Sequence, residues 1–230
     1  MKVLISDKMS DGCVDILERN PDVAVDVRTD LSLEELVEVI GEYEALIVRS
    51  STQVTEEVLG AGQRLRVVGR AGAGVDNIDV SAATRRGVVV MNTPGGNSVS
   101  AAEHSFSMLM ALARNLPQAA ASLKAGKWEK SKFTGVELAG KTLGVIGLGK
   151  VGREVAQRGS AFRMKVLGVD PFVSAEAAGS YGTQLVPPSQ LYAESDFISL
   201  HLPLTGQNHY FISDGELDQC KEGVRIVNCA

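Results

Sequence analysis

A glycine-rich turn between a β-branched run and a helical run constrains the fold of this chain more than any other feature. The run Thr142–Ile146 leads directly into Gly147-Leu148-Gly149-Lys150-Val151-Gly152, and residues 153–156 continue in a helical pattern. A bare GxGxxG spacing is weak evidence in a chain with 24 glycines, but a preceding strand and a following helix are its dinucleotide-binding context. Gly147 would permit the tight turn, Gly149 the approach of a pyrophosphate, and Gly152 close packing of helix on strand. The motif therefore predicts a βαβ unit with the phosphates at the helix start, near the N–H groups of Lys150, Val151 and Gly152.

An acidic residue follows the next strand-like run. Asp170 stands directly after residues 165–169, which places it 18 residues beyond Gly152. A carboxylate there accepts hydrogen bonds from the adenosine ribose hydroxyls and repels a 2′-phosphate. Pro171 and Phe172 come next, in place of an arginine that would accommodate the phosphate. The sequence therefore predicts NAD rather than NADP, with a structural glycine turn and an incidental acid as the alternative.

Short β-branched runs alternate with helical stretches along the whole chain, which indicates an α/β fold with mostly parallel sheets. We expect strands at residues 2–6, 23–27, 45–48, 66–69, 88–91, 142–146, 165–169, 183–186, 197–200 and 224–227. We expect helices at residues 11–19, 33–40, 55–59, 80–86 and 98–114. Ser32 and Glu35 form a capping box at the start of the second helix. The turn cluster 92–97 separates two series of strands, so we predict two doubly wound parallel-sheet domains of the Rossmann and flavodoxin type, residues 1–92 and 93–230.

Composition excludes several classes of protein. The formal net charge is −5 and no block of like charge stands out, which argues against a nucleic-acid or polybasic membrane surface. The longest strongly apolar stretch, 108–113, is far shorter than the roughly 20 residues of a membrane span. The opening MKVLISDKMSDG matches neither a secretory signal nor a transit peptide. Cys13, Cys220 and Cys229 have no metal-ligand spacing, and their odd number suits reduced thiols, so we expect a cytoplasmic protein without a metal site.

Two further strand ends point to the same site. The run 197–200 leads into His201-Leu202-Pro203, and the last run leads into Asn228-Cys229-Ala230. Ligands of a doubly wound sheet bind beyond the carboxyl ends of its strands. Taken alone, His201 is more often an ordinary loop histidine than a functional one.

These motifs, together with several longer phrases, resemble the D-2-hydroxyacid dehydrogenase family, and within it the branch that acts on 3-phosphoglycerate. The phrases are Val68-Gly69-Arg70-Ala71-Gly72-Ala73-Gly74-Val75-Asp76-Asn77-Ile78-Asp79, Met91-Asn92-Thr93-Pro94-Gly95-Gly96-Asn97-Ser98, Gly126-Lys127-Trp128 and Val227-Asn228-Cys229-Ala230. They extend over the whole chain and lie outside the glycine motif, which makes the resemblance specific. The resemblance implies a substrate domain followed by an NAD domain.

The resemblance also implies particular site residues. Arg49 and Ser50, at a strand end, belong to the substrate site, and Arg70 and Asn97 match positions that face substrate. The turn of Gly72, Ala73 and Gly74 would offer backbone N–H groups to the substrate carboxylate. Against the cofactor the resemblance places Ala73, His201, Leu202, Pro203, Asn228, Cys229 and Ala230. Both arginines could instead end their strands in solvent without binding a ligand.

The chain departs from the family pattern after the Asn-Cys-Ala phrase. In the family an arginine follows at once, and the acid and histidine of the catalytic relay come further on, whereas this chain ends at Ala230. The resemblance then implies the front part of an enzyme, with a truncated second domain and a first domain that lacks its returning helix. We expect no catalytic residue and no dehydrogenase activity in this chain alone.

Three functions stay open. The first is the NAD-dependent oxidation of 3-phosphoglycerate to 3-phosphohydroxypyruvate, in serine biosynthesis, by the enzyme to which this chain would belong. The second is the reduction of glyoxylate, hydroxypyruvate or another 2-oxo acid by a related dehydrogenase. The third is a non-catalytic NAD-binding module. The Arg-Ala-Gly-Ala-Gly and Asn-Cys-Ala phrases favour the first.

The sequence also predicts a homodimer or higher homo-oligomer. Residues 98–114 are apolar on most sides, and a helix of that kind is buried on several sides. Trp128, the only tryptophan, stands among charged residues, where a large aromatic is more often an interface anchor than a solvent-facing side chain. Packing of Trp128 on its own domain is the alternative. We expect residues 98–135 to contact a second copy, with Lys130 or Lys132 near the neighbour's substrate cleft.

Overall fold

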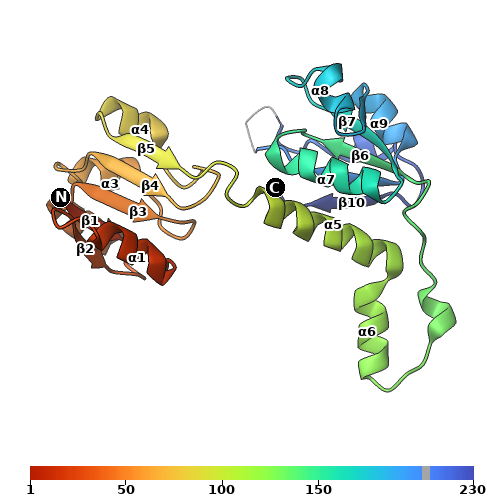
Figure 1. The fold of residues 1–230 in the computed structure, drawn as a ribbon, viewed down its shortest axis with the longest axis horizontal. Coiled ribbons are helices and arrows are strands. Elements are labelled where there is room, and N and C mark those ends of the chain that lie inside the picture. Colours follow the sequence, from red (N-terminus) through yellow and green to blue (C-terminus); the bar gives the residue numbers. More distant parts are fainter. Residues whose placement is uncertain (204–207) are drawn as a thin grey trace. The chain divides into compact units, whose positions relative to one another are not determined.

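The computed structural model of the chain describes residues 1–203 and 208–230, and it divides into two compact units, Met1–Asn97 and Ser98–Ala230 (Figure 1). The division falls at the end of the turn cluster 92–97. Each unit contains a five-stranded parallel sheet flanked by helices. The prediction of an α/β fold with doubly wound parallel sheets is therefore confirmed.

The first unit has the strand order β2-β1-β3-β4-β5. Its strands are β1 (Lys2–Ile5), β2 (Ala24–Val27), β3 (Ala45–Val48), β4 (Val67–Arg70) and β5 (Val89–Asn92). Its helices are α1 (Asp11–Glu18), α2 (Leu33–Val39), the 3-10 turn η1 (Ile40–Glu42), α3 (Glu56–Ala61) and α4 (Val80–Arg85). The strand order reverses between β1 and β3, and ligands of such sheets bind at the reversal.

Local signals and burial explain how these elements form. The predicted capping box starts α2, because Ser32 Oγ accepts from Glu35 N at 3.2 Å and Glu35 Oε2 accepts from Ser32 N at 2.8 Å. One face of the sheet packs on α2, α3 and α4 through a core that includes Leu4, Leu46, Val68, Leu36, Val58 and Ala82. The other side of β5 is not covered in the same way by the described residues. Val89 and Met91 alternate with the core-facing Val90 and are 58% and 59% exposed. Within the described residues, that side of β5 is uncovered.

The second unit has the strand order β10-β9-β6-β7-β8. Its strands are β6 (Thr142–Ile146), β7 (Lys165–Val169), β8 (Thr183–Leu185), β9 (Phe197–Leu200) and β10 (Arg225–Asn228). Its helices are α5 (Ser98–Arg114), α6 (Leu116–Lys124), η2 (Lys130–Phe133, a 3-10 turn), α7 (Lys150–Ala161), α8 (Ala175–Gly179), α9 (Pro188–Glu194) and α10 (Asp214–Leu217). This order reverses between β6 and β9.

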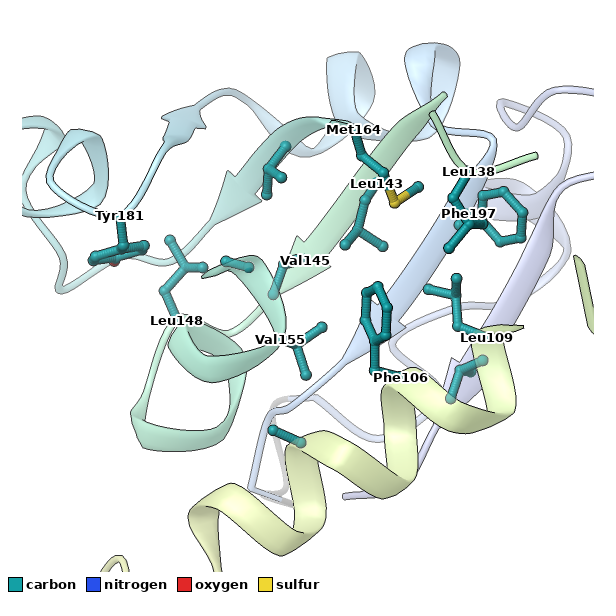
Figure 2. Close-up of a cluster of buried hydrophobic side chains, with 14 of the residues drawn as sticks. Phe106, Leu109, Leu138, Leu143, Val145, Leu148, Val155, Met164, Tyr181 and Phe197 are labelled. Atoms are coloured by element: carbon teal, nitrogen blue, oxygen red, sulfur yellow. The ribbon is translucent and has the colours of Figure 1, made fainter. Parts of the chain in front are cut away.

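Both faces of the second sheet are covered. Figure 2 shows Phe106 and Leu109 of α5 and Val155 of α7 packed around Leu143 and Val145 of β6. The opposite face packs on α9 through a second cluster that includes Leu191, Tyr192, Ile146 and Ile198. Burial on both faces explains why β6 and β9 are nearly continuous apolar runs.

Helix α5 is buried on one side by its own unit. Its buried residues are Ser98, Ala102, Ser105, Phe106, Leu109 and Ala113, whereas Val99, Met108 and Leu112 are 50%, 41% and 42% exposed. The helix ends at Arg114, and the next residue, Asn115, has a φ of +52° and is the N-cap of the separate helix α6. No helix in the described part of the chain is long and apolar enough to cross a membrane.

Candidate functional site

The carboxyl ends of four strands meet at one edge of the second sheet. Ile146 pairs in register with Val169 and with Leu200, and Leu200 pairs with Asn228. The residues that follow these strand ends are therefore neighbours along the edge, on both sides of the point where the strand order reverses. They include the glycine turn, Asp170, the segment 201–203 and the segment 229–230, all of which the sequence assigns to the cofactor.

The three motif glycines differ in what surrounds them. Gly147 has a φ of +87°, and a Cβ on it would lie 2.7 Å from the carbonyl oxygen of His201. A Cβ on Gly152 would overlap the carbonyl oxygen of Gly147. A Cβ on Gly149, the N-cap of α7, would meet no atom within 4 Å. The chain's own packing thus demands the first and third glycines, while the second keeps the helix start open to a phosphate group.

Asp170 is held beside the glycine turn by two backbone groups. Its Oδ2 accepts from Leu148 N and its Oδ1 accepts from Phe172 N, each at 2.8 Å. An ionised carboxylate has about four acceptor sites, so both oxygens keep capacity for ribose hydroxyls. The side chain of Phe172, two residues after Asp170, is 95% exposed. The structure thus presents a fixed negative charge next to the turn that would cradle the pyrophosphate.

His201 is a neutral, packed side chain. Its Nε2 lies 2.8 Å from the hydroxyl of the buried Ser199, and its backbone N–H donates to Ile146 O at 2.8 Å. Burial lowers the pKa of His201 to about 4, so the ring carries no charge at neutral pH. Because its carbonyl group also lies against Gly147, His201 supports the glycine turn through its backbone.

A hollow of about 540 Å³ opens beyond the ends of β9 and β10. Four of the residues assigned to the cofactor are among those that line it, which are Leu200, Leu202, Pro203, Asn208, Tyr210, Phe211, Ile212, Leu217, Ile226, Asn228 and Ala230. Cys229 lies apart from them: its Sγ is 3.5 Å from Met108 Sδ of α5. The hollow is mostly apolar and suits a flat ring with few polar groups.

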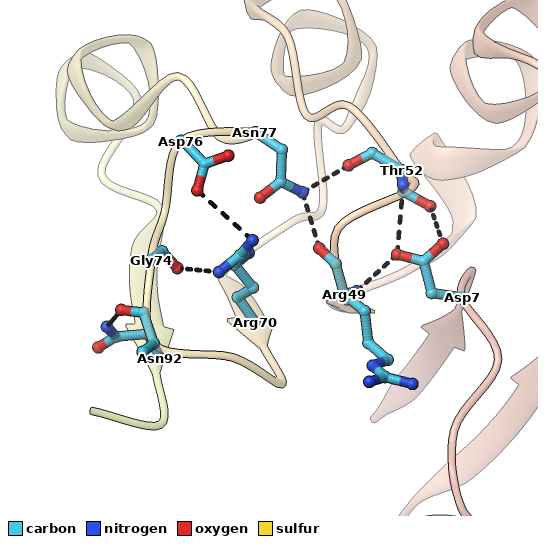
Figure 3. Close-up of polar contacts among 9 residues, drawn as sticks. Asp7, Arg49, Thr52, Arg70, Gly74, Asp76, Asn77 and Asn92 are labelled. Atoms are coloured by element: carbon cyan, nitrogen blue, oxygen red, sulfur yellow. Dashed lines mark hydrogen bonds and ion pairs between the residues drawn. The ribbon is translucent and has the colours of Figure 1, made fainter. Parts of the chain in front are cut away.

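In the first unit, a buried acid shapes the loop after β3. Asp7 is 6% exposed and accepts from Arg49 N at 2.5 Å, from Thr52 N at 3.2 Å and from Thr52 Oγ1 at 3.0 Å. Asn77 Nδ2 donates to Arg49 O at 2.8 Å and to Thr52 O at 2.6 Å (Figure 3). These contacts fix the backbone of the loop after β3, while the side chains of Arg49 and Ser50, which the sequence assigns to the substrate site, are exposed. Asp7 and Asn77 were not predicted as site residues, although an acid directly after a buried strand was a signal for Asp7.

The side chain of Arg70 turns back onto its own loop. Its Nη1 donates to Gly74 O at 2.6 Å, its Nη2 lies 3.4 Å from Asp76 Oδ1, and the side chain is only 10% exposed. A Cβ on Gly72 would lie 2.9 Å from Arg70 Nη1, and one on Gly74 would lie 2.7 Å from Asp76 Oδ1. The two glycines therefore make room for the guanidinium group and its acid. A direct contact of Arg70 with substrate stays a prediction.

Two backbone donors of this turn are available. The N–H of Gly72 donates to Arg70 O at 2.9 Å. In the described part of the chain, the N–H groups of Ala73 and Gly74 have no acceptor, and both residues are exposed. Two adjacent N–H groups of this kind suit a carboxylate. Asn97, the last residue of the first unit, is also exposed.

The predicted residues fall into two sets. The substrate residues and Ala73 belong to the first unit, and the other cofactor residues belong to the second. Among the described residues, no group of three His, Cys, Asp or Glu side chains has a geometry that could hold a metal ion.

Comparison with known proteins extends over both units. The model of the D-isomer specific 2-hydroxyacid dehydrogenase NAD binding domain matches residues 106–230, more than half of the chain. D-3-phosphoglycerate dehydrogenase of Rattus norvegicus is 52% identical over 229 residues, which cover 100% of this chain and 43% of that protein. Its counterpart in Archaeoglobus fulgidus is 50% identical over 230 residues, 100% of this chain and 44% of that protein. An NAD+-bound 3-phosphoglycerate dehydrogenase structure from Entamoeba histolytica has a TM-score of 0.81 at 32% identity, and covers 99% of this chain and 71% of that one.

The chain spans less than half the length of the curated relatives it matches. The matched family region contains the glycine turn, Asp170 and the ends of β9 and β10, so the second unit is an NAD-binding domain. Homology to D-3-phosphoglycerate dehydrogenase continues through the first unit, where the loops after β3 and β4 lie. The chain therefore belongs to the D-isomer specific 2-hydroxyacid dehydrogenase family.

Proposed function

We propose that this chain forms the substrate-binding and NAD-binding parts of an enzyme that oxidises 3-phosphoglycerate to 3-phosphohydroxypyruvate in serine biosynthesis. One observation carries the proposal. The identity of about 50% to D-3-phosphoglycerate dehydrogenases covers the whole chain, including the first unit with its substrate loops. A general dinucleotide domain would explain likeness in the second unit only.

NAD fits the second unit on structural grounds. The open side of Gly149 lets a pyrophosphate reach the N–H groups at the start of α7, where the helix dipole favours negative charge. The carboxylate of Asp170 would bind the adenosine ribose, and the apolar hollow beyond β9 and β10 would hold the nicotinamide end. When bound, NAD supplies the acceptor for the hydride.

Two groups of the first unit bind the substrate. The N–H groups of Ala73 and Gly74 donate hydrogen bonds to the substrate carboxylate, and the exposed Arg49 guanidinium provides a planar fork for an anionic end of the molecule. Arg70, Ser50 and Asn97 complete this set. Together these groups orient the substrate, and orientation is itself a large part of rate enhancement.

We propose that the arginine, acid and histidine of the family's relay are not among the 230, so that this chain alone binds ligands without turning them over. The side chains of Val89 and Met91 on β5 are exposed, and we propose that a further helix packs on them.

We also propose a homodimer through residues 98–135. Apolar side chains project from α5 and α6 into solvent, since Leu112, Leu116 and Leu123 are 42%, 52% and 58% exposed. Trp128 follows α6 and is 81% exposed. Exposed aromatic and aliphatic side chains in one continuous segment are typical of an interface.

A substrate panel tests the function. The intact enzyme would be assayed for NADH formation with 3-phosphoglycerate and D-lactate, and for NADH consumption with hydroxypyruvate and glyoxylate. We expect the highest kcat/KM with 3-phosphoglycerate. A preference for glyoxylate or hydroxypyruvate would assign a related dehydrogenase, and NAD binding without turnover of any substrate would assign a non-catalytic module.

A further inference from the structure

The turn after β4 has three consecutive carbonyl groups, and each accepts a hydrogen bond from a different residue. The pairs are Thr93 N to Gly72 O at 2.9 Å, Asn92 Nδ2 to Ala73 O at 2.6 Å and Arg70 Nη1 to Gly74 O at 2.6 Å. Arg70 and Asn92 are register partners at the ends of β4 and β5, so both side chains reach the turn from one edge of the sheet (Figure 3). The orientations of the three peptide planes that contain these carbonyl groups are thereby set.

Peptide geometry converts these carbonyl contacts into N–H directions. No described peptide bond is cis, so each N–H points away from the carbonyl of the preceding residue. Asn92 holds Ala73 O, and the N–H of Gly74 is therefore directed away from Asn92. Among the described residues, Asn92 contributes the side chain that holds this peptide, while Arg70 holds the next one.

The peptide between Ala73 and Gly74 needs such a contact. Glycine permits a wide range of backbone angles, so a peptide bordered by Gly74 can rotate at little steric cost. A half-turn would replace the N–H by the carbonyl oxygen of Ala73. An attraction to a carboxylate would then become a repulsion.

We propose that Asn92 is a positioning residue of the substrate site, which fixes the Ala73–Gly74 peptide with the Gly74 N–H turned toward the substrate carboxylate. The inference rests on the proposed function, because that function assigns the carboxylate to this N–H pair. An amide is the fitting group at position 92, since Nδ2 donates to a carbonyl whereas a carboxylate in its place would repel both Ala73 O and the substrate.

The test compares two ligands that differ in the carboxylate. Dissociation constants of 3-phosphoglycerate and of glycerol 3-phosphate, which has a hydroxymethyl group in its place, would be measured by calorimetry on the intact enzyme with NADH present, because NADH cannot accept a hydride and the ligand is not turned over. The variants are Asn92→Ala, Asn92→Asp and the control Thr84→Ala. Thr84 Oγ1 donates to Val80 O at 2.8 Å in the same unit, so the control also removes an exposed side chain-to-backbone bond.

We expect Asn92→Ala to raise the dissociation constant of 3-phosphoglycerate roughly 10-fold, which is the effect of one hydrogen bond to a charged group. The dissociation constant of glycerol 3-phosphate should stay within about twofold of the wild-type value. Asn92→Asp should weaken the binding of 3-phosphoglycerate further, and Thr84→Ala should change the affinity for neither ligand. Equal loss for both ligands, or no loss for either, would overturn the positioning role while the proposed function stands. A wild-type enzyme that does not prefer 3-phosphoglycerate would overturn the proposed function itself. NAD affinity and thermal melting, measured on each variant, separate these outcomes from misfolding.

Discussion

Asp170 should decide which dinucleotide the second unit binds. Its carboxylate is fixed by Leu148 N and Phe172 N at 2.8 Å, directly beside the glycine turn. A ribose bound there places its 2′-hydroxyl in hydrogen-bond reach of the carboxylate. In NADP a phosphate stands at that position, and two negative groups meet.

The size of the preference follows from that geometry. Two unit charges about 4 Å apart repel by about 1 kcal/mol in bulk water and about 4 kcal/mol at the intermediate dielectric near a protein surface. Asp170 is half-buried, so we take about 2 kcal/mol, which corresponds to a preference for NAD of roughly 30-fold. The preference should shrink at high salt, because exposed charges are screened.

The variant Asp170→Asn removes the charge and keeps the shape. Its single amide oxygen can retain one of the two backbone contacts, so we expect the affinity for NAD to fall by a few fold. The ratio of the affinities for NAD and NADP should fall below about 3. Titration of each nucleotide by calorimetry or fluorescence measures both constants.

A matched control lies at the opposite edge of the same sheet. Asp196 accepts from Thr142 N at 2.8 Å and lies 3.1 Å from Lys221 Nζ, so Asp196→Asn makes the same change in net charge away from the glycine turn. The control should leave the ratio unchanged. Equal affinities of the wild type for both nucleotides, or an unchanged ratio in Asp170→Asn, would refute the reasoning.

Three further outcomes are expected. A polypeptide of these 230 residues should bind NAD but form no detectable NADH from 3-phosphoglycerate, since loss of acid–base catalysis alone costs ~10²–10⁴-fold; activity above a contaminant control would contradict this. Light scattering should give a mass near twice 24.4 kDa, and Trp128→Ala should shift it toward the monomer; a wild-type monomer at micromolar concentration would contradict the interface. The ring of His201 should titrate near pH 4 by NMR, and the free energy of unfolding should fall by up to about 3 kcal/mol as the pH drops from about 6.5 to 4, because only the unfolded imidazole takes up a proton there. His201→Gln should flatten that pH dependence, and a ring pKa near 6.5 would contradict the burial argument.

Strands could be predicted from the sequence more completely than exposed helices. The bounds expected for β3, β6, β7 and β9 agree with the structure, because burial on both faces makes each of them a continuous apolar run. The central strand β4 and the edge strands β5 and β10 each lie one residue later than expected, because an apolar run does not mark the residue at which strand pairing begins. Helix α6 was not predicted, and none of its residues is buried.

Some residues of the candidate site could be predicted from the sequence, and others could not. The glycine turn and Asp170 could be found from spacing, because the motif is continuous in sequence and each residue type has one physical reason. Asn77 and Asn92 could not, because they act through backbone contacts with distant residues. Asp7 was marked only by its place after a strand, because its partner Arg49 is 42 positions away. The direction of the Arg70 side chain likewise depends on the space that two glycines leave.

The exposure of Trp128 has a spectroscopic consequence. It is the only indole in the chain and is 81% exposed, so intrinsic tryptophan emission reports on the arm after α6 rather than on either hydrophobic core. In an isolated chain the emission should already be red-shifted and should change little when denaturant unfolds the sheets. Association that covers the indole should shift the emission to the blue. The same wavelength measurement that fails as a folding assay for this chain therefore serves as a label-free titration of its self-association.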